Sequence, residues 1–339
     1  MAISPSATRA FITGLAGQTI SPLERIFLRE AAPWGLILFK RNVSNPRQVI
    51  DLVREFRDTV GWEAPVLIDQ EGGRVQRLGP PHWPAYPPGA VYSALYDRDP
   101  ASGLAAARLG AHLIASDLTA LGIDVDCLPL ADVPVSEADP VIGDRAYGTE
   151  PAKVAAIAGA VADGLLAAGV LPVLKHLPGH GRARADSHKE LPVVDTDRAT
   201  LEATDFAAFR PLNKLPLGMT AHVVFSAIDR LAPATTSVTM VREVIRGSIG
   251  FAGLLMSDDV SMGALSGTIG ERSTQALAAG CDVVLHCNGD LAEMREVAAV
   301  APQLSGAAAQ RAEAALALRS QREEFDVAAA REIFNAMVA

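Results

Sequence analysis

The sequence predicts an α/β fold, a single (β/α)8 barrel of the TIM type, and three observations lead to this prediction. Short apolar runs recur along the whole chain, polar or Gly-rich loops follow them, and amphipathic stretches lie between most of them. Apolar runs that are continuous rather than alternating are typical of strands buried on both faces of a parallel sheet. Eight such runs separated by helices favour a closed barrel over an open sheet.

The predicted strands are the apolar runs, which in chain order cover residues 10–14, 35–39, 65–68, 123–128, 170–174, 217–221, 253–256 and 282–286. The predicted helices are amphipathic stretches between them, at residues 45–60, 101–121, 151–168, 199–209 and 270–279. Two segments interrupt this alternation. Residues 78–89 are rich in proline and should form an irregular loop. Residues 176–194 are too long for an ordinary loop after a strand, and such long loops are often functional.

The chain is predicted to form one domain. Its 339 residues alone would allow two domains, but α/β barrels often exceed about 250 residues as a single domain. No linker, charge run or low-complexity segment divides the sequence. We therefore expect residues 1–339 to form one barrel, with a helical C-terminal segment at about 302–339 that is rich in Ala, Arg and Glu.

Composition excludes several classes of protein. The formal net charge of −9 argues against nucleic acid or an anionic membrane as a partner, although a local pocket can still be basic. The three cysteines include no CxxC pair, so a disulfide framework or a zinc site is not expected and buried free thiols are. Residues 1–14 lack the pattern of a signal peptide, and no apolar run reaches the length of a membrane span. The predicted location is the cytoplasm.

In an α/β barrel the active site lies at the carboxyl ends of the strands, so polar residues that follow the apolar runs are candidates for function. These residues are Asp258 and Asp259 after 253–256; Asp69, Glu71, Arg74 and Arg77 after 65–68; Lys175 and His176 after 170–174; Asp132, Asp144 and Arg145 after 123–128; and His222 after 217–221. Gathering so many charged groups at one rim costs free energy, so such a rim is expected to bind something polar.

Each group of candidate residues also has a purely structural interpretation. The two aspartates after 253–256 are acceptable helix caps. Residues 71–74, EGGR, are acceptable as a glycine turn, Lys175 and His176 as a strand-end ion pair, and residues 186–188, DSH, as a surface turn. The convergence of all these residues on one rim favours a functional site over four independent structural features.

The residue types suggest glycoside chemistry. A carboxylate at a rigid strand end can attack an anomeric carbon and form a covalent glycosyl-enzyme. A second group must then protonate the leaving oxygen. In an extended segment residues i and i+2 lie on the same side, so Asp186 can orient the imidazole of His188 and stabilise its protonated form. A His–Asp dyad is a competent acid/base near neutral pH.

Three segments carry a resemblance to a known family: residues 67–78, LIDQEGGRVQRL; 175–192, KHLPGHGRARADSHKELP; and 253–262, GLLMSDDVSM. Residues 35–45, GLILFKRNVSN, and 143–148, GDRAYG, add to it. With these motifs in this order, the sequence resembles bacterial β-N-acetylglucosaminidases of glycoside hydrolase family 3, the NagZ type. The middle segment is the most specific, because family 3 β-glucosidases take their acid/base glutamate from another domain.

The resemblance implies a role for each matching residue. Asp258 is then the nucleophile, and His188, supported by Asp186, is the acid/base. The residues implied to contact the terminal N-acetylglucosamine are Asp69, Arg77, Arg145, Lys175 and His176. The implied activity is retaining, exo-acting removal of β-1,4-linked N-acetylglucosamine from anhydro-muropeptides during cell-wall recycling. No metal or organic cofactor is expected, the expected partner is the amino-sugar or muropeptide substrate, and the expected state is a monomer.

The chain departs from the family pattern within the 176–194 loop. Residues 182–185 are Arg-Ala-Arg-Ala where many relatives have acidic and hydroxylic residues. One hypothesis is that Arg182 or Arg184 approaches the acidic groups of a muropeptide, and the alternative is that both arginines are simply solvated.

Other functions stay open from the sequence. Within family 3, another sugar specificity is an alternative, and so is phosphorolysis, because a histidine acid/base carries no fixed negative charge to repel phosphate. A barrel that binds amino sugars without turnover is a second alternative, although Asp258, Asp186 and His188 are all present. A metal-dependent hydrolase is a third, disfavoured by the lack of an HxH or HExxH pattern.

Overall fold

The computed structural model of the chain describes residues 8–320, 323–324 and 326–339. Residues 1–7, half of the segment in which no signal peptide was predicted, lie outside the described residues, as do residues 321, 322 and 325 of the predicted helical tail. Among the helices of the described part, none is long and apolar enough to span a membrane.

Eight parallel strands close into a barrel in the order β1-β12-β11-β9-β7-β6-β3-β2. Their bounds are β1 (Arg9–Thr13), β2 (Pro33–Leu38), β3 (Val66–Ile68), β6 (Val125–Asp126), β7 (Leu171–Leu177), β9 (Leu217–Thr220), β11 (Leu254–Asp259) and β12 (Val283–His286). Each overlaps one predicted strand. The predicted (β/α)8 fold is therefore confirmed.

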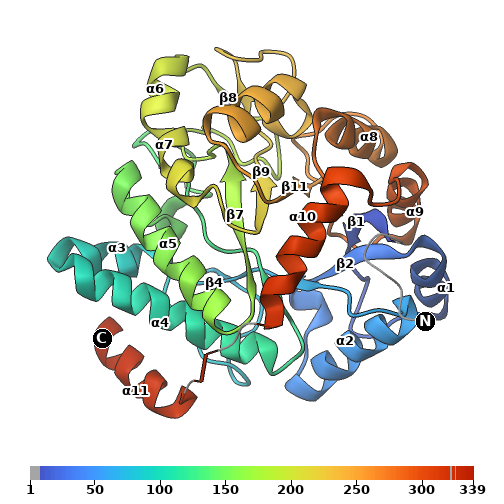
Figure 1. Cartoon of the computed structure of the whole chain (residues 1–339), viewed down its shortest axis with the longest axis horizontal. Coiled ribbons are helices and arrows are strands. Elements are labelled where there is room, and N and C mark those ends of the chain that lie inside the picture. Colours follow the sequence, from blue (N-terminus) through green and yellow to red (C-terminus); the bar gives the residue numbers. More distant parts are fainter. Residues whose placement is uncertain (1–7, 321–322, 325) are drawn as a thin grey trace.

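Helices surround the barrel (Figure 1). Their bounds are α1 (Pro22–Ala31), α2 (Pro46–Val60), α3 (Gly89–Arg98), α4 (Pro100–Thr119), α5 (Pro151–Ala167), α6 (Arg198–Ala203), α7 (Asp205–Phe209), α8 (Ile269–Ala279), α9 (Leu291–Val300), α10 (Gly306–Ala317) and α11 (Val327–Val338). A wide, π-type helix η6 (Met240–Ser248) follows β9. Short 3-10 turns are η2 (Lys40–Asn42), η3 (Gly143–Arg145), η4 (Arg210–Leu212), η5 (Ala234–Thr236) and η7 (Leu318–Ser320).

Local sequence signals determine where several helices begin and end. Ser21 and Glu24 form a reciprocal capping box at the start of α1, and Thr268 and Glu271 do the same for α8. Gly61 ends α2 with φ 77°, a left-handed conformation that glycine adopts without steric cost. These caps satisfy backbone groups that a helix end would otherwise leave without a partner.

Some predictions about element bounds were wrong. Strand β11 was predicted to end at residue 256 but continues to Asp259, so that Asp258 and Asp259 belong to the strand itself. The helix predicted over 199–209 is divided into α6 and α7 at Thr204, whose φ of −120° and ψ of −80° are not helical. Arg182 binds the side chains of Thr204 and Asp205 at this break. Strand β7 also continues beyond the predicted end at residue 174 to Leu177, so that Lys175 and His176 belong to the strand itself.

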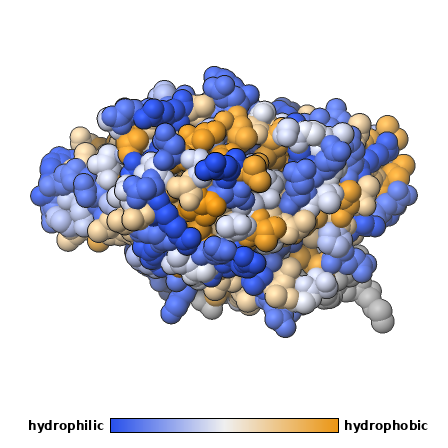
Figure 2. Space-filling model, turned by 90° about the horizontal axis from the view of Figure 1, so that it is seen from above, coloured by the Kyte–Doolittle hydropathy of each residue, from blue (hydrophilic) through white to orange (hydrophobic). Residues whose placement is uncertain are grey.

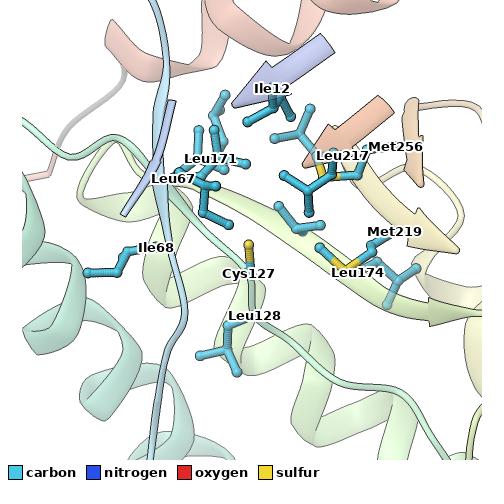
Figure 3. Close-up of a cluster of buried hydrophobic side chains, with 14 of the residues drawn as sticks. Ile12, Leu67, Ile68, Cys127, Leu128, Leu171, Leu174, Leu217, Met219 and Met256 are labelled. Atoms are coloured by element: carbon cyan, nitrogen blue, oxygen red, sulfur yellow. The ribbon is translucent and has the colours of Figure 1, made fainter. Parts of the chain in front are cut away.

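Apolar side chains fill the barrel interior. Ile12, Leu67, Leu171, Leu217 and Met256 come from five different strands and converge there with relative exposures of zero (Figure 3). The predicted free, buried thiols are confirmed for the three cysteines, Cys127, Cys281 and Cys287. Because apolar side chains fill the interior, the groups that can meet a ligand lie at the barrel ends. In the view from above, hydrophilic residues cover much of the surface and hydrophobic ones gather toward its middle (Figure 2).

A small hairpin stands beside the carboxyl end of β3. It pairs β4 (Gln70–Gly72) with β5 (Val75–Gln76) in antiparallel fashion. Gly72 has φ 96°, and a Cβ there would lie 2.3 Å from the carbonyl oxygen of Pro87. Only glycine fits this approach, which brings the hairpin against the proline-rich loop predicted over 78–89. A second pair, β8 (Val193–Val194) with β10 (Val224–Phe225), closes the 176–194 loop.

The C-terminal segment packs on the outside of the barrel. Helix α11 lies along α4, and Phe334 packs against the rings of Tyr86 and Tyr92 (Figure 1). Arg331 donates to Asp117 at 3.0 Å and to the hydroxyl of Tyr86 at 3.2 Å. Within the segment 302–339 the structure has the helices α10 and α11 and the short turn η7.

Candidate active site

A pocket of about 280 Å³ opens at the carboxyl ends of the barrel strands. Its polar lining includes seven of the residues predicted for the site, namely Asp69, Arg77, Arg145, Lys175, His176, His188 and Asp258. The eighth, Asp186, lies behind His188 and is bonded to it. The predicted convergence of these residues on one rim is what the structure shows.

Asp258 lies at the end of β11, half-buried in the pocket. Its Oδ1 accepts a hydrogen bond of 2.8 Å from the backbone N–H of Asp259, and its own N–H donates to Thr220 Oγ1 at 3.3 Å. Burial alone would raise the pKa of Asp258, but the positive charge that His222 and His176 carry once they are protonated in acid, together with the hydrogen bond from the N–H of Asp259, holds that pKa below its usual value. The carboxylate is therefore ionised at neutral pH, as a nucleophile must be.

Both oxygens of the neighbouring carboxylate of Asp259 accept hydrogen bonds from nearby backbone N–H groups and from a serine hydroxyl. Its Oδ1 accepts from Ser261 N at 3.0 Å and Cys287 N at 3.1 Å, and its Oδ2 accepts from Ser261 Oγ at 2.7 Å. Neither aspartate caps a helix, because the next helix, α8, begins at Ile269 and is capped by Thr268. The structural interpretation of the two aspartates as helix caps is thus wrong, and Asp258 has the freer carboxylate of the two.

His222 supports the end of β11 from behind. Burial lowers the pKa of His222, so the ring is neutral at neutral pH. Its Nε2 lies 3.0 Å from the carbonyl oxygen of Asp259, which only accepts, and its Nδ1 lies 2.7 Å from Thr235 Oγ1. Nε2 therefore carries the proton and donates it, while Nδ1 accepts from the threonine. This residue, which the sequence placed at the rim, holds the backbone next to Asp258.

A cluster of buried charges forms one wall of the pocket. Lys175 Nζ lies 3.1 Å from Asp69 Oδ1 and 2.6 Å from Glu71 Oε1. Arg77 Nη2 donates to Asp69 Oδ2 at 2.8 Å. Arg145 binds Glu71 through two parallel hydrogen bonds, each of 2.8 Å. The three cations and two carboxylates of this cluster leave one positive charge in excess.

The charges of this cluster hold one another in the ionised state. Burial would raise the pKa of Asp69, but Lys175 and Arg77 lower it well below its usual value. Burial would likewise raise the pKa of Glu71, but Arg145 and Lys175 lower it. The pKa of Lys175 is raised, because the two carboxylates outweigh its burial. A fixed array of donors and acceptors that lines a pocket suits the hydroxyl groups of a sugar.

The sequence placed Glu71 among the rim candidates, but its pairing with Lys175 and Arg145 was not predicted. Its side chain is only 4% exposed, and it binds Lys175 and Arg145 at once. The position of Glu71 next to Gly72 and Gly73 favoured a turn, and the turn is present. Arg145 also donates from Nη1 to the carbonyl oxygen of Val141 at 3.1 Å, so most of its guanidinium is engaged by the protein.

His176 is oriented by a buried carboxylate. Its Nδ1 lies 2.8 Å from Asp132 Oδ2, and the backbone N–H groups of His176 and His180 point at Oδ1 of the same residue. Burial would raise the pKa of Asp132, but His176 and His180 lower it to about 2. The ring of His176 is therefore held in one orientation along the pocket wall.

The 176–194 loop places the predicted acid/base beside the pocket. His188 Nδ1 lies 2.8 Å from Asp186 Oδ1, and the backbone N–H of His188 donates to the same oxygen at 3.0 Å. Burial would raise the pKa of Asp186, but these bonds lower it, so its carboxylate is ionised. The pairing is as predicted, but the extended backbone proposed for it is wrong. Residues 186–189 form a turn, in which Lys189 N donates to Asp186 O at 2.9 Å.

The two arginines of the loop have different surroundings. Arg182 Nε donates to Asp205 Oδ2 at 2.6 Å, and its Nη2 donates to Thr204 Oγ1 at 3.1 Å. The carboxylate of Asp205 is almost completely buried. Arg182 is thus engaged by α7, so the hypothesis that it approaches the substrate is not supported. Arg184 is exposed.

Among the described residues, no three His, Cys, Asp or Glu side chains are grouped so that they could hold a metal ion. This arrangement suits nucleophilic cleavage of a glycoside, because it combines an ionised carboxylate at a strand end, a wall of polar groups and a His–Asp pair beside the pocket.

Comparison with known proteins agrees with this geometry. Residues 24–318 match the profile of the glycosyl hydrolase family 3 N-terminal domain. A β-hexosaminidase from Alkalilimnicola ehrlichii is 42% identical over 281 residues, which are 81% of this chain and 79% of the relative. A β-hexosaminidase from Xylella fastidiosa is 38% identical over 304 residues, which are 88% of this chain and 89% of the relative. NagZ from Neisseria gonorrhoeae, solved in complex with N-trifluoroacetyl-D-glucosamine, is similar over 100% of both chains, with a TM-score of 0.87 and 29% identity.

Proposed function

Because the chain belongs to glycoside hydrolase family 3 and its curated relatives are β-hexosaminidases, we propose that it is a retaining exo-β-N-acetylglucosaminidase. One observation carries this proposal. The ionised carboxylate of Asp258 lines a pocket that the imidazole of His188 also lines, while the adjacent Asp259 is bonded to backbone and Ser261.

The reaction proceeds in two steps. Asp258 attacks the anomeric carbon, the glycosidic bond breaks, and the imidazolium of His188 gives its Nε2 proton to the leaving oxygen. A water molecule then attacks the same carbon, His188 takes its proton, and the bond to Asp258 breaks. Two inversions leave the product with the configuration of the substrate. Asp186 holds Nδ1 of the imidazole throughout, because it lies 2.8 Å away.

The charged wall of the pocket orients the sugar. Asp69 and Lys175 present a carboxylate and an ammonium side by side, 3.1 Å apart, which suits adjacent hydroxyl groups. Arg77 and His176 line the same wall. Glu71 keeps Lys175 and Arg145 in place rather than contacting the sugar. Because the pocket is small and lies at the barrel end, it favours removal of a single terminal residue.

The biological role is the finer part of the proposal. We propose anhydro-muropeptides as natural substrates and peptidoglycan recycling as the process, a role consistent with the similarity to a bacterial NagZ. We also propose that the chain acts as one catalytic domain, with α11 as an accessory helix beyond the matched residues 24–318. The cytoplasmic location and the monomeric state stay predictions.

The test is a comparison of substrates. An aryl β-N-acetylglucosaminide should be cleaved much faster than the matching aryl β-glucoside, and phosphate should not change the rate or yield a sugar phosphate. NMR of the first product should show the β-anomer. A preference for the glucoside or formation of a sugar phosphate would assign the chain another activity within the family. Release of N-acetylglucosamine from an anhydro-muropeptide would support the proposed role.

A further inference from the structure

His180 lies near the start of the 176–194 loop that also carries His188, just after β7, and is not needed for any step of the proposed reaction. It is 3% exposed, and its ring packs edge-on against that of His176 with centroids 5.8 Å apart. Burial and the neighbouring His176 lower the pKa of His180 to about 4, so the ring is neutral at neutral pH. A buried neutral histidine close to a catalytic loop is expected to serve a hydrogen bond rather than a charge.

That hydrogen bond goes to Ser187. His180 Nε2 lies 2.9 Å from Ser187 Oγ, while Nδ1 is buried and has no hydrogen-bond partner within the described residues. The side chain of His180 therefore makes its one hydrogen bond to the residue between Asp186 and His188. The backbone of His180 is fixed as well, because its N–H donates to buried Asp132 at 2.6 Å.

Ser187 is held from the opposite side by the segment that follows the nucleophile strand. Its carbonyl oxygen accepts from Ala264 N at 3.2 Å, and that of His188 accepts from Gly263 N at 3.2 Å. A Cβ on Gly263 would lie 2.7 Å from the carbonyl oxygen of Lys189, so the close approach requires glycine here. Ser187 itself is 2% exposed, although His188 next to it is exposed.

Two sets of contacts therefore connect the turn at residues 186–189 to the ends of β7 and β11. One runs from β7 through His180 to Ser187, and the other runs from the segment after Asp258 to the backbone of the same turn. We propose that His180 and Ser187 are positioning residues, whose hydrogen bond sets the place of the acid/base imidazole of His188 relative to Asp258. This proposal rests on the proposed function, because it concerns how the acid/base is presented to the substrate.

The experiment uses two substrates that differ in their need for an acid. An alkyl β-N-acetylglucosaminide needs its leaving oxygen protonated, whereas a nitrophenyl β-N-acetylglucosaminide does not. In Ser187→Ala, kcat/KM should fall at least about tenfold for the alkyl substrate and less than about twofold for the nitrophenyl substrate, because general acid catalysis contributes about 10²–10⁴-fold. KM for the alkyl substrate should change little.

Matched variants separate positioning from loss of structure. His180→Leu has a similar volume but no hydrogen bond, and it should reproduce the selective loss. His180→Gln places an amide near the position of Nε2, and it should restore most of the alkyl activity. Ser226→Ala removes a hydroxyl from the neighbouring small sheet, where it bonds Val194 O at 3.4 Å, and should leave both substrates unaffected.

The outcomes distinguish the inference from the function on which it rests. His188→Ala should show the same selective loss as Ser187→Ala, but larger. If His188→Ala is selective while Ser187→Ala and His180→Leu lower both substrates equally or neither, the positioning role is overturned and the proposed function stands. If His188→Ala itself is not selective, the assignment of His188 as acid/base fails, and the positioning role fails with it.

Discussion

The two halves of the catalytic apparatus are held in different ways. Asp258 belongs to the end of β11, which pairs with β9 and β12; its backbone N–H donates to Thr220 Oγ1, and its carboxylate accepts from the N–H of Asp259. His188 lies on a loop, its side chain is 65% exposed, and its place depends on side-chain bonds from Asp186 and through Ser187. The comparison teaches that the barrel itself places the proposed nucleophile, whereas a few specific contacts place the proposed acid/base.

The largest effect on kcat is expected for a substitution at the end of β11, which we call the strand side; the 176–194 loop is the loop side. Asp258→Asn removes the nucleophile while keeping its shape, so kcat should fall about 10⁴-fold or more for alkyl and aryl substrates alike. Asp259→Asn is the matched control. It weakens the bonds to Ser261 and Cys287, so we expect a loss of about 1–3 kcal/mol in unfolding free energy and a much smaller loss of kcat. Steady-state kinetics and urea unfolding of both variants check this. Equal losses of kcat would contradict the distinction between the two aspartates.

A smaller and selective effect is expected on the loop side. Asp186→Asn keeps the turn but removes the charge that stabilises the imidazolium of His188, so kcat/KM for an alkyl substrate should fall about 10²-fold. A nitrophenyl substrate needs no acid and should lose far less in kcat/KM. The ratio of the two kcat/KM values is the measurement, and an unchanged ratio would show that Asp186 is not the partner of the acid/base.

Much of the strand side could be predicted from the sequence, and less of the loop side could be. Continuous apolar runs indicate parallel strands, and the residues that end them, Asp258 among them, must share one rim. The pairing of Asp186 with His188 was predicted, but through an extended backbone instead of the turn observed at 186–189. The barrel is a periodic structure with a sequence signature, whereas a loop conformation depends on individual tertiary contacts.

The pairings that escaped prediction join residues far apart in the chain. Glu71 binds Arg145, which is 74 positions away, and nothing in the local EGGR sequence indicates this. Arg182 binds Asp205, 23 positions away, and the same contact lies at the break between α6 and α7. The motif match indicated which residues matter at the site, but pairings of this kind follow only from the folded chain.

The free energy of unfolding should also depend on pH, because the fold lowers the pKa of His180 and of Asp132. In the unfolded chain His180 has its usual pKa of 6.5, and in the folded protein its pKa is about 4, so the unfolded state binds more protons between these values. Stability should therefore fall as the pH drops through this range, by at most about 3 kcal/mol from this residue. The pKa of Asp132, lowered from 3.8 to about 2, adds a further loss below pH 3.8.

Urea unfolding at neutral pH and at about pH 4.5 measures this effect. His180→Leu should lose less stability between the two values than the unaltered protein does, since the variant has no imidazole to protonate. The same dependence on pH in both proteins would show that His180 is not kept neutral by the fold.

The smallest effects are expected at the two arginines of the loop. Arg182→Ala leaves the buried carboxylate of Asp205 without its cation, so unfolding free energy should fall by about 1–3 kcal/mol. Arg184→Ala, at an exposed position, should change it by less than about 0.5 kcal/mol. Neither should alter the relative rates for a muropeptide and a neutral aryl glycoside. A muropeptide-specific loss in Arg184→Ala would instead show that this side chain contacts the acidic aglycone.

The central claim is that Asp258 forms a covalent bond to the sugar. A slow 5-fluoro N-acetylglucosaminyl substrate should trap this intermediate, and mass spectrometry of the digested protein should locate the sugar on Asp258. A label on Asp259, or no label with an enzyme that is still active, would contradict the claim.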